Sequence, residues 1–360
     1  MTLKAITLTP ERYKEWDEFC LQSGDAWFWH TTGWLRYTLA YKPELATRDL
    51  SVLICDGNDR IKAIVPLTLE TKSLGGRGIR EFSSGEEPIP GPAYANSLSA
   101  PDKELVEKFV FFKVDELARQ HDVKRASFRQ TPLTANFLNH NYYFNYFLKY
   151  GYLDISLNTQ LIDLRPSEEE LWRALRRNHR RNIKKVENLT AKIYTSAEIT
   201  PAIFEKYQIM HRIAAGRQTR PDETFRIMFE WIKEHLGFLA AIEVKGKTIG
   251  FEYFTAYKNN GYGFSAANDP EFAFLPIRHL VEWQAILRMK RMGYDFYEIG
   301  VQWYAPLLHD FPDEKRRNIA HFKRGFGGFA APCFRAEKFY GKDYFLEVYR
   351  DRIKKFANTL

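Results

Sequence analysis

The chain has 360 residues, which is too many for one ordinary hydrophobic core, so we expect two domains. With 27% charged and 45% hydrophobic residues it has the composition of a soluble globular protein, and it has no apolar run of ~18 residues that would span a membrane. Lysine and arginine outnumber aspartate and glutamate by 53 to 45, and the net charge of +8 favours a polyanionic partner: nucleic acid, a phosphate-bearing nucleotide or an anionic membrane surface.

The N-terminus and the cysteines indicate the compartment. Residues 1–6 lack the long apolar segment of a signal peptide. Cys20, Cys55 and Cys333 are far apart and odd in number, which fits free thiols in a reducing cytosol. These two features predict a cytoplasmic protein. No pair of the cysteines has metal-ligand spacing, so the sequence predicts no metal site.

The first half of the chain alternates strand and helix signals. Thr9 and Pro10 form a helix start, and Asp56-Gly57 is a strong hairpin turn. In chain order the patterns predict a strand over residues 3–8, a helix from residue 10, an aromatic segment leading into a helix over 27–36, a hairpin of strands 50–55 and 61–69, a strand over 79–83, an irregular loop over 85–92, a helix over 102–120 and a strand over 124–128.

The second half contains a strongly basic helix. Ser167 and Glu170 form a capping box ahead of a predicted helix over residues 171–186. Its apolar residues fall at helical spacing, and the remaining arc carries seven cations, which repel one another by a few tenths of a kcal/mol per neighbouring pair. An anionic ligand would offset this repulsion.

The remainder repeats the order of the first half. The patterns predict an extended segment over 152–164, helices over 201–215 and 222–235 with a break at 216–221, a meander of strands over 238–244, 249–257 and 262–267, a helix from 276 to 293, a strand over 296–299 and a basic amphipathic helix in the tail 339–360.

The segment 318–328 holds the main candidate for chemistry. It sets Lys323 next to Phe322 and follows it with Gly325, Gly327 and Gly328, which permit tight turns and close approach. A cation in such a place can hold an anionic or carbonyl oxygen. A Gly-rich hairpin with a solvated lysine explains the spacing equally well, so both interpretations stay open.

Gly293-Tyr294-Asp295 leading into a strand, and then the segment 322–328, resemble the C-terminal signature of the FemABX-like transferases. The resemblance extends from about residue 9 to about 340, without the coiled-coil arm that some members insert. It implies an α/β (α+β) protein of two tandem GNAT-like domains (the acyl-CoA N-acyltransferase fold), each a mixed sheet flanked by helices. The expected boundaries are 1–158 for the first domain, with 336–360 packing back onto it, and 159–335 for the second.

The resemblance also implies roles for individual residues. Lys323 would bind the donor's phosphate or the developing oxyanion, and Glu337 would assist proton transfer, with a surface salt bridge as its alternative. Three arginines would bind the acceptor's phosphates, three residues would line a groove across the meander, and four cations would bind the donor. The acceptor arginines are Arg36, whose alternative is an exposed helix arginine, and Arg217 and Arg220, whose alternative is helix-end charge. The groove residues are Tyr253, Tyr262 and Ser265, with core or rim packing as the alternative, and the donor-binding cations are Arg177, Arg180, Arg181 and Lys184.

Family members transfer an aminoacyl or acyl group to an amine of a cell-envelope precursor. We therefore expect an N-acyl or N-aminoacyltransferase whose donor is aminoacyl-tRNA or acyl-CoA, with no tightly bound cofactor. The acceptor would be a nucleotide- or lipid-linked sugar or peptide, and the protein would work in the cytoplasm, with peripheral contact at the inner face of an anionic membrane left open.

Other functions are open on the same residues. One is a coenzyme A-dependent N-acyltransferase for an amino sugar or small amine, although the segment 274–278 lacks the glycines of the usual pyrophosphate-binding turn. Another is a nucleic-acid-binding module built on helix 171–186. Phospholipid aminoacylation by a related pair of domains is also open.

Overall fold

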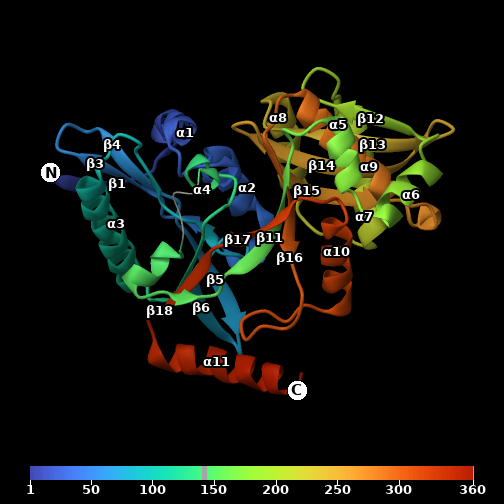
Figure 1. Cartoon of the computed structure of the whole chain (residues 1–360). Coiled ribbons are helices and arrows are strands. Elements are labelled where there is room, and N and C mark those ends of the chain that lie inside the picture. Colours follow the sequence, from blue (N-terminus) through green and yellow to red (C-terminus); the bar gives the residue numbers. More distant parts are fainter. Residues whose placement is uncertain (140–143, 360) are drawn as a thin grey trace. The chain divides into compact units, whose positions relative to one another are not determined.

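The computed structural model describes residues 1–139 and 144–359, and the chain divides into two compact units (Figure 1). Unit 1 comprises Met1–Leu157, Ala305–Pro312 and Pro332–Leu360. Unit 2 comprises Asn158–Tyr304 and Asp313–Ala331.

Unit 1 contains two sheets with the strand orders β1-β3-β4-β8 and β10-β18-β9-β6-β5-β2. Its strands are β1 (Leu3–Thr7), β2 (Arg48–Asp49), β3 (Val52–Asp56), β4 (Ile61–Val65), β5 (Thr68–Leu74), β6 (Arg77–Phe82), β7 (Ile89–Pro90, beside β9), β8 (Ala93–Tyr94), β9 (Val123–Arg129), β10 (Leu153–Asp154) and β18 (Arg335–Phe339). Its helices are α1 (Tyr13–Gln22), α2 (Thr32–Tyr41), α3 (Ala100–Gln120), α4 (Ala135–Leu138) and α11 (Lys342–Ala357).

The predicted hairpin of unit 1 is wrong in one respect: its second strand, predicted over 61–69, is two strands, β4 and β5, in different sheets, and β3 is likewise preceded by β2 of the other sheet. The break falls at Ser51 and at Pro66, which has no N–H to donate to a ladder. The Ser51 hydroxyl instead accepts the Leu67 N–H at 3.0 Å, and Leu50 N–H donates to Leu67 O at 2.8 Å. The loop predicted over 85–92 likewise contains the short strand β7.

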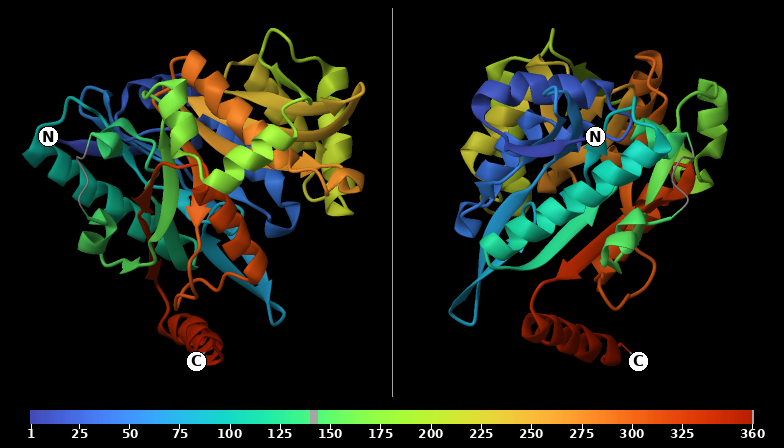
Figure 2. Two further views of the ribbon diagram at one scale, coloured as in Figure 1. Left: turned by 45° about the vertical axis from the view of Figure 1, so that its right-hand side comes forward. Right: turned by 90° about the vertical axis from the view of Figure 1, so that its left-hand side faces the viewer.

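Helix α3 builds the core of unit 1. Ser99 caps it, and its buried residues recur at helical spacing on one face, which lies across β1, β4 and β9 (Figure 2). Aromatic contacts continue the core from this face: the ring of Phe111 lies 4.1 Å from that of Tyr150 and 6.4 Å from that of Phe128.

Unit 2 contains one sheet with the strand order β12-β13-β14-β15-β16-β11-β17. Its strands are β11 (Leu157–Asp163), β12 (Thr190–Tyr194), β13 (Gly237–Val244), β14 (Lys247–Tyr257), β15 (Asn260–Asn268), β16 (Phe296–Gln302) and β17 (Phe329–Cys333), the last of which continues into unit 1. Its helices are α5 (Glu168–Ala174), α6 (Arg177–Lys185), α7 (Pro201–Ala215), α8 (Asp222–Lys233), α9 (Ile277–Arg291) and α10 (Glu314–Arg324).

Strands β15 and β16 pair only at one end. They run parallel over Asn260–Tyr262 and Phe296–Glu298, whereas on its other edge β16 pairs with β11 along its whole length. Helix α9 connects these two strands, and helix α10 packs on β16. The lengths of β15 and β16 that do not pair with each other therefore leave room between α9 and α10.

The two faces of this sheet pack on different helices. On β14, Glu252 and Phe254 face the α9 side, whereas Phe251 and Tyr253 face α7, as strand alternation requires. The apolar part of the α9 side is one cluster that includes Phe238, Phe254 and Ile286.

The predicted helix 171–186 is also wrong in part, because it breaks at Leu175 and Arg176. The capping box of α5 forms as predicted, with Ser167 accepting the Glu170 N–H. Beyond the break, the Arg176 N–H donates to Gly325 O at 2.9 Å, a tertiary bond that periodicity cannot reveal. His179, Ile183 and Val186 still form a buried stripe.

The Gly-rich segment after Lys323 is not a hairpin. Lys323 lies in the last turn of α10, and the glycines bring the chain close to neighbouring elements. A β-carbon at Gly325 would collide with the ring of His179, and one at Gly328, where φ is +76°, would collide with Leu161 O. The glycines therefore serve close packing of α10 on α6 and β11.

Candidate active site in unit 2

A pocket of about 1090 Å³ opens in unit 2 beside the start of α9. Its walls come from the end of α7, the end of β15, the segment before α9, the first turn of α9 and one side of α10. The lining residues are Ala214, Ala266–Pro270, Phe272, Ala273, Leu275–His279, Glu314, Lys315, Asn318, Ile319, Phe322 and Lys323. The volume is large enough for a small-molecule substrate, and the walls are mainly apolar with a few polar groups.

The pocket wall includes most of the segment 274–278, where the usual pyrophosphate-binding turn would lie. Helix α9 begins at Ile277, and no side chain caps its N-terminus. Such a helix end favours an anion because its first N–H groups point outward and the helix dipole is positive there. No glycine precedes the helix, so the usual glycine-containing cradle is missing here.

Lys323 reaches the pocket from α10. Its Nζ lies against Gly300 of β16, where φ is +116° and a β-carbon would collide with the amine. Nζ forms no hydrogen bond or ion pair with any residue in the described part of the chain. Loss of hydration lowers the pKa of Lys323; Glu282, Glu252 and Glu298 oppose this shift, and Arg278 adds to it.

A buried charge cluster lies beside the lysine. Arg278 Nη2 donates to Glu252 Oε1 at 2.9 Å and to Glu282 Oε1 at 3.3 Å, and the Tyr297 hydroxyl donates to Glu282 Oε2 at 2.8 Å. The two carboxylates are only 3% and 2% exposed. Glu252 Oε2 has no hydrogen-bond partner among the residues described.

Burial dominates the electrostatics of Glu252. Burial raises the pKa of Glu252 well above its ordinary value; Arg278 opposes the rise and Glu282 adds to it. The shift is toward the uncharged form of Glu252, although Arg278 binds both carboxylates. Glu298, which accepts from the Thr159 hydroxyl at 2.7 Å, is the remaining carboxylate near Lys323.

The other ionisable groups of the pocket are engaged or weak as bases. Asp269 forms an ion pair with Lys247 at 2.9 Å. His279 Nε2 lies 3.2 Å from Asn182 Nδ2, and burial, with His179 next in effect, lowers the pKa of His279 to about 4. The imidazole is therefore neutral and weakly basic at neutral pH.

The four cations predicted to bind the donor line a second hollow of unit 2, of about 1000 Å³, along α6. Trp172 forms part of its wall, and the polar lining consists of Arg177, Asn178, Arg180, Arg181, Lys184 and Lys185. No carboxylate contributes to it, so its charge is strongly positive. Arg180 is held in place, since Nη1 donates to the carbonyls of Arg173 and Leu175 at 2.8 and 2.7 Å, where the predicted helix breaks.

The other predicted residues of unit 2 lie outside both hollows. Arg220 packs on Phe225 and Phe264, and its Nη2 lies 3.4 Å from Ser265 Oγ, so these two predicted residues do meet. Arg217 is exposed in the loop after α7. Tyr253, Tyr262 and Ser265, the residues predicted to line a groove across the meander, line neither hollow.

Tyr253 is a core residue. It is fully buried, stacks on Tyr207 and donates its hydroxyl to Met228 O at 2.8 Å, so the structure contradicts its predicted place in a groove. Tyr262 is half-buried on β15 opposite Thr255.

The remaining two predicted residues belong to unit 1. Arg36 lies half-buried on α2, with Asp17 and Tyr13 within electrostatic range. Glu337 is not on the surface: it is 0% exposed on β18. Arg125 Nη1 at 3.2 Å and Arg352 Nη2 at 2.9 Å bind its oxygens, and the Tyr349 hydroxyl donates to it at 3.3 Å. These contacts favour a structural role over proton transfer.

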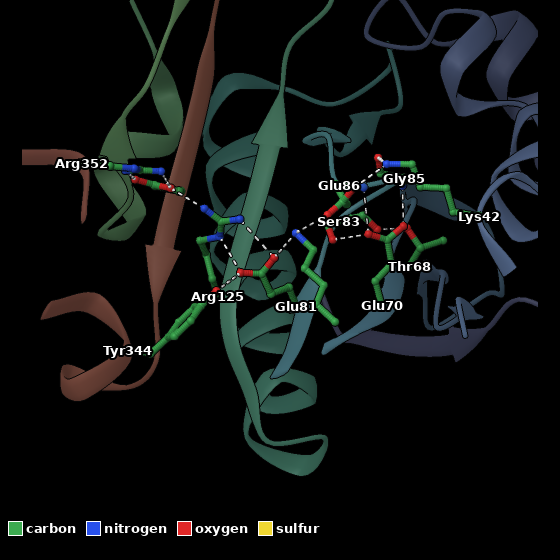
Figure 3. Close-up of polar contacts among 12 residues, drawn as sticks. Lys42, Thr68, Glu70, Glu81, Ser83, Gly85, Glu86, Arg125, Tyr344 and Arg352 are labelled. Carbon is green, nitrogen blue, oxygen red and sulfur yellow. Dashed lines mark hydrogen bonds and ion pairs between the residues drawn. The ribbon is translucent and has the colours of Figure 1, made fainter. Parts of the chain in front are cut away.

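The Glu337 contacts continue as a chain of charges across the sheet of unit 1. Figure 3 follows them from Arg352 through Arg125 to Glu81, which also binds Lys72 at 2.6 Å and the Tyr344 hydroxyl at 2.7 Å. Helix α11 thereby attaches to β18 and β6 through polar contacts, although none of its side chains is fully buried.

Comparisons with known proteins agree with this geometry. Residues 173–314 match the acetyltransferase (GNAT) domain family, which covers α6, α9 and most of the pocket wall. FemX superposes with a TM-score of 0.67 at 9% identity, covering 96% of this chain and 100% of FemX. The fold is that of two GNAT-like domains in tandem. No curated protein matches the sequence.

Two further structures share this tandem GNAT fold. L-PGS from Bacillus licheniformis gives a TM-score of 0.57 at 11% identity over 96% of this chain and 97% of that one. A tandem GNAT protein from the clavulanic acid biosynthesis pathway gives 0.52 at 12% identity over 94% and 99%. The fold predicted from the FemABX-like resemblance is confirmed, and the acetyltransferase domain supports an acyltransferase.

The described residues contain neither a metal site nor a membrane-spanning helix. No group of three or more histidine, cysteine or acidic side chains there could hold a metal ion. No helix in the same part of the chain is both long and apolar enough to cross a bilayer.

Sequence reasoning missed the charge cluster beside Lys323. A signal was present, because Glu252 and Glu298 are single carboxylates within otherwise apolar strands. Arg278 and Glu282 stand four residues apart on α9, the spacing of an ion pair on one helix face. What the sequence could not show is that β14, α9, β16 and α10 bring these groups to one place.

Proposed function

We propose that unit 2 transfers an acyl or aminoacyl group to an amine, with the activated donor bound in the pocket at the start of α9. The observation that carries this proposal is that the pocket combines an uncapped helix N-terminus with an unpaired lysine, Lys323. The first can bind the donor's phosphate, and the second lines the same pocket and is a candidate for contact with the reacting groups. Arg278 and Lys315 add positive charge to the same walls.

The donor is an acyl thioester or an aminoacyl ester. Both are already activated, so positioning the amine next to the carbonyl supplies much of the rate. The basic hollow along α6 favours a donor that carries RNA, because Arg177, Arg180, Arg181 and Lys184 present a surface for several phosphates. The acceptor in this proposal is a nucleotide- or lipid-linked sugar or peptide with a free amine, for whose phosphates Arg36, Arg217 and Arg220 are candidate ligands.

Mass spectrometry of reaction products tests the function. The purified protein is incubated with acyl-CoA or aminoacyl-tRNA and with amine-bearing nucleotide sugars or lipid-linked peptides. We expect a new amide product whose mass equals acceptor plus acyl group minus the leaving group. A thermal shift with acetyl-CoA, measured separately, distinguishes the two donors, and the absence of an amide with every donor would refute acyl transfer.

A nucleic-acid-binding function is the second candidate, and the α6 hollow is the observation in its favour. It predicts that RNA binds with a steep loss of affinity at higher salt, whether or not the RNA is aminoacylated. Transfer that depends on the ester bond separates the enzyme from a binding module.

A further inference from the structure

Acyl transfer to an amine needs a group that takes the proton which the amine loses. Glu337, the residue predicted for this role, has both carboxylate oxygens bound by Arg125, Arg352 and Tyr349. A proton acceptor for the transfer must therefore come from the pocket of unit 2.

The pocket offers few acceptors. Arg278 keeps its proton throughout the accessible pH range, and Asp269 is bound to Lys247. His279 binds a proton only at a pKa of about 4, which makes it a weak base at neutral pH. Glu314, in the exposed first turn of α10, and Lys315 lie at the solvent side of the same helix.

Lys323 differs from these groups in its surroundings. Lys323 lines the pocket, its Nζ lies against Gly300, and Nζ has no hydrogen-bond or ion-pair partner in the described chain. An ammonium needs three acceptors, and this site supplies none within hydrogen-bonding distance. The uncharged amine, in contrast, loses little by lying there and has a lone pair to offer.

The charges around Lys323 come from three elements. Glu252 lies on β14, Arg278 and Glu282 on α9, and Glu298 on β16, where Thr159 also binds it. Arg278 binds both Glu252 and Glu282 and offsets part of their charge. The cluster thus limits how far the carboxylates can favour the ammonium form of the lysine.

We infer that Lys323 accepts the proton of the attacking amine in the transfer, and that Glu252, Arg278 and Glu282 are positioning residues that set the pH range in which it does so. The inference rests on the proposed function. As the amine nitrogen bonds to the donor's carbonyl carbon, its proton passes to Nζ of Lys323. The bond from that carbon to the leaving sulfur or oxygen then breaks, the leaving group receives the proton from Lys323, and the lysine is neutral again.

The first test measures the lysine itself and needs no substrate. The intact protein is acetylated with trace acetic anhydride over a range of pH, and the reactivity of each lysine is read by mass spectrometry. Lys206, exposed on α7 of the same unit, is the internal reference. We expect the reactivity of Lys323 to rise at a lower pH than that of Lys206, and the same or a higher pH would overturn the inference.

The second test uses variants in the transfer reaction. Lys323→Arg keeps the positive charge but cannot accept a proton, so kcat should fall by about 100-fold or more. Lys206→Arg is the matched control and should transfer at the wild-type rate. An Lys323→Arg variant within about tenfold of the wild type would mean that the charge, and not the proton acceptor, matters.

The third test addresses the positioning residues. Glu282 opposes the fall in the pKa of Lys323, so Glu282→Gln should move the acidic limb of the kcat profile to lower pH. An unmoved or upward-shifted limb would refute the role of the cluster. If the wild type forms product while Lys323 behaves like Lys206, this inference fails and the proposed function stands; if no donor yields product, the proposed function fails independently.

Discussion

Replacing Arg125 by methionine should destabilise unit 1 strongly. The guanidinium lies between two carboxylates that are 0% exposed: Nε is 2.9 Å from Glu81 Oε1 and Nη1 is 3.2 Å from Glu337 Oε2 (Figure 3). Removing one partner of a buried pair typically costs about 3–5 kcal/mol. Because Lys72 still reaches Glu81 and Arg352 still reaches Glu337, we expect the lower end, about 3 kcal/mol.

Amide hydrogen exchange measures this loss locally, which suits a chain of two units because a single unfolding transition cannot be assumed. A loss of about 3 kcal/mol corresponds to roughly 100-fold faster exchange in β9, since 1.4 kcal/mol is a factor of ten. Arg77→Met is the control: its side chain is 71% exposed and lies 3.7 Å from Glu347, so exchange should change less than about fivefold.

At low pH, Arg125→Met should reduce the free energy of unfolding of unit 1 by less than it does at neutral pH. Burial acts to raise the pKa of Glu81, but Arg125 and Lys72 outweigh it and the pKa is lowered. This carboxylate therefore contributes stability above its unfolded pKa, and the contribution disappears as pH falls through the folded value. The exchange ratio of variant to wild type should shrink toward the acidic end, and a pH-independent ratio or one near that of Arg77→Met would refute the reasoning.

Three further changes test other parts of the structure. Gly300→Ala places a β-carbon against Lys323 at a φ of +116°, so it should cost about 1–3 kcal/mol in the hydrogen exchange of β16 and lower the transfer rate. Tyr253→Phe removes the bond to Met228 O and should cost about 1 kcal/mol while transfer stays unchanged. Arg181→Ala, in the α6 hollow, should reduce the slope of log RNA affinity against log salt by about 0.7–0.9.

Each of these has a clear contrary result. A fully stable and active Gly300→Ala would show that Lys323 does not need its place on β16. A loss of transfer in Tyr253→Phe would indicate that the Tyr253 hydroxyl contributes to substrate binding. An unchanged salt slope for Arg181→Ala would remove the α6 hollow from RNA binding.

The sequence predicted most of the fold because its signals are local. The capping box of Ser167 and Glu170, the stripe of α3 and the turns of the β13–β15 meander depend on neighbours a few residues apart. The errors arose where tertiary contacts override the local pattern. Pro66 moves β5 into another sheet, and the bond from Arg176 to Gly325 O ends α5 within a continuous apolar stripe.

The candidate site was predictable only in part. Lys323 could be chosen from its aromatic and glycine neighbours, and the basic residues of α6 from their number. Glu337 was misjudged because its partners, Arg125 and Arg352, come from β9 and α11, far away in the chain. Burial of a carboxylate among such partners is a property of the assembled sheet and leaves no local trace in the sequence.

The central claim is that acyl transfer takes place in the pocket at the start of α9. Ala214 and Ala215 are neighbouring exposed residues at the end of α7, but only Ala214 lines the pocket. The account predicts that Ala214→Trp fills the pocket and raises the KM for the donor or abolishes product, whereas Ala215→Trp matches the wild type. Equal transfer by both variants would contradict it.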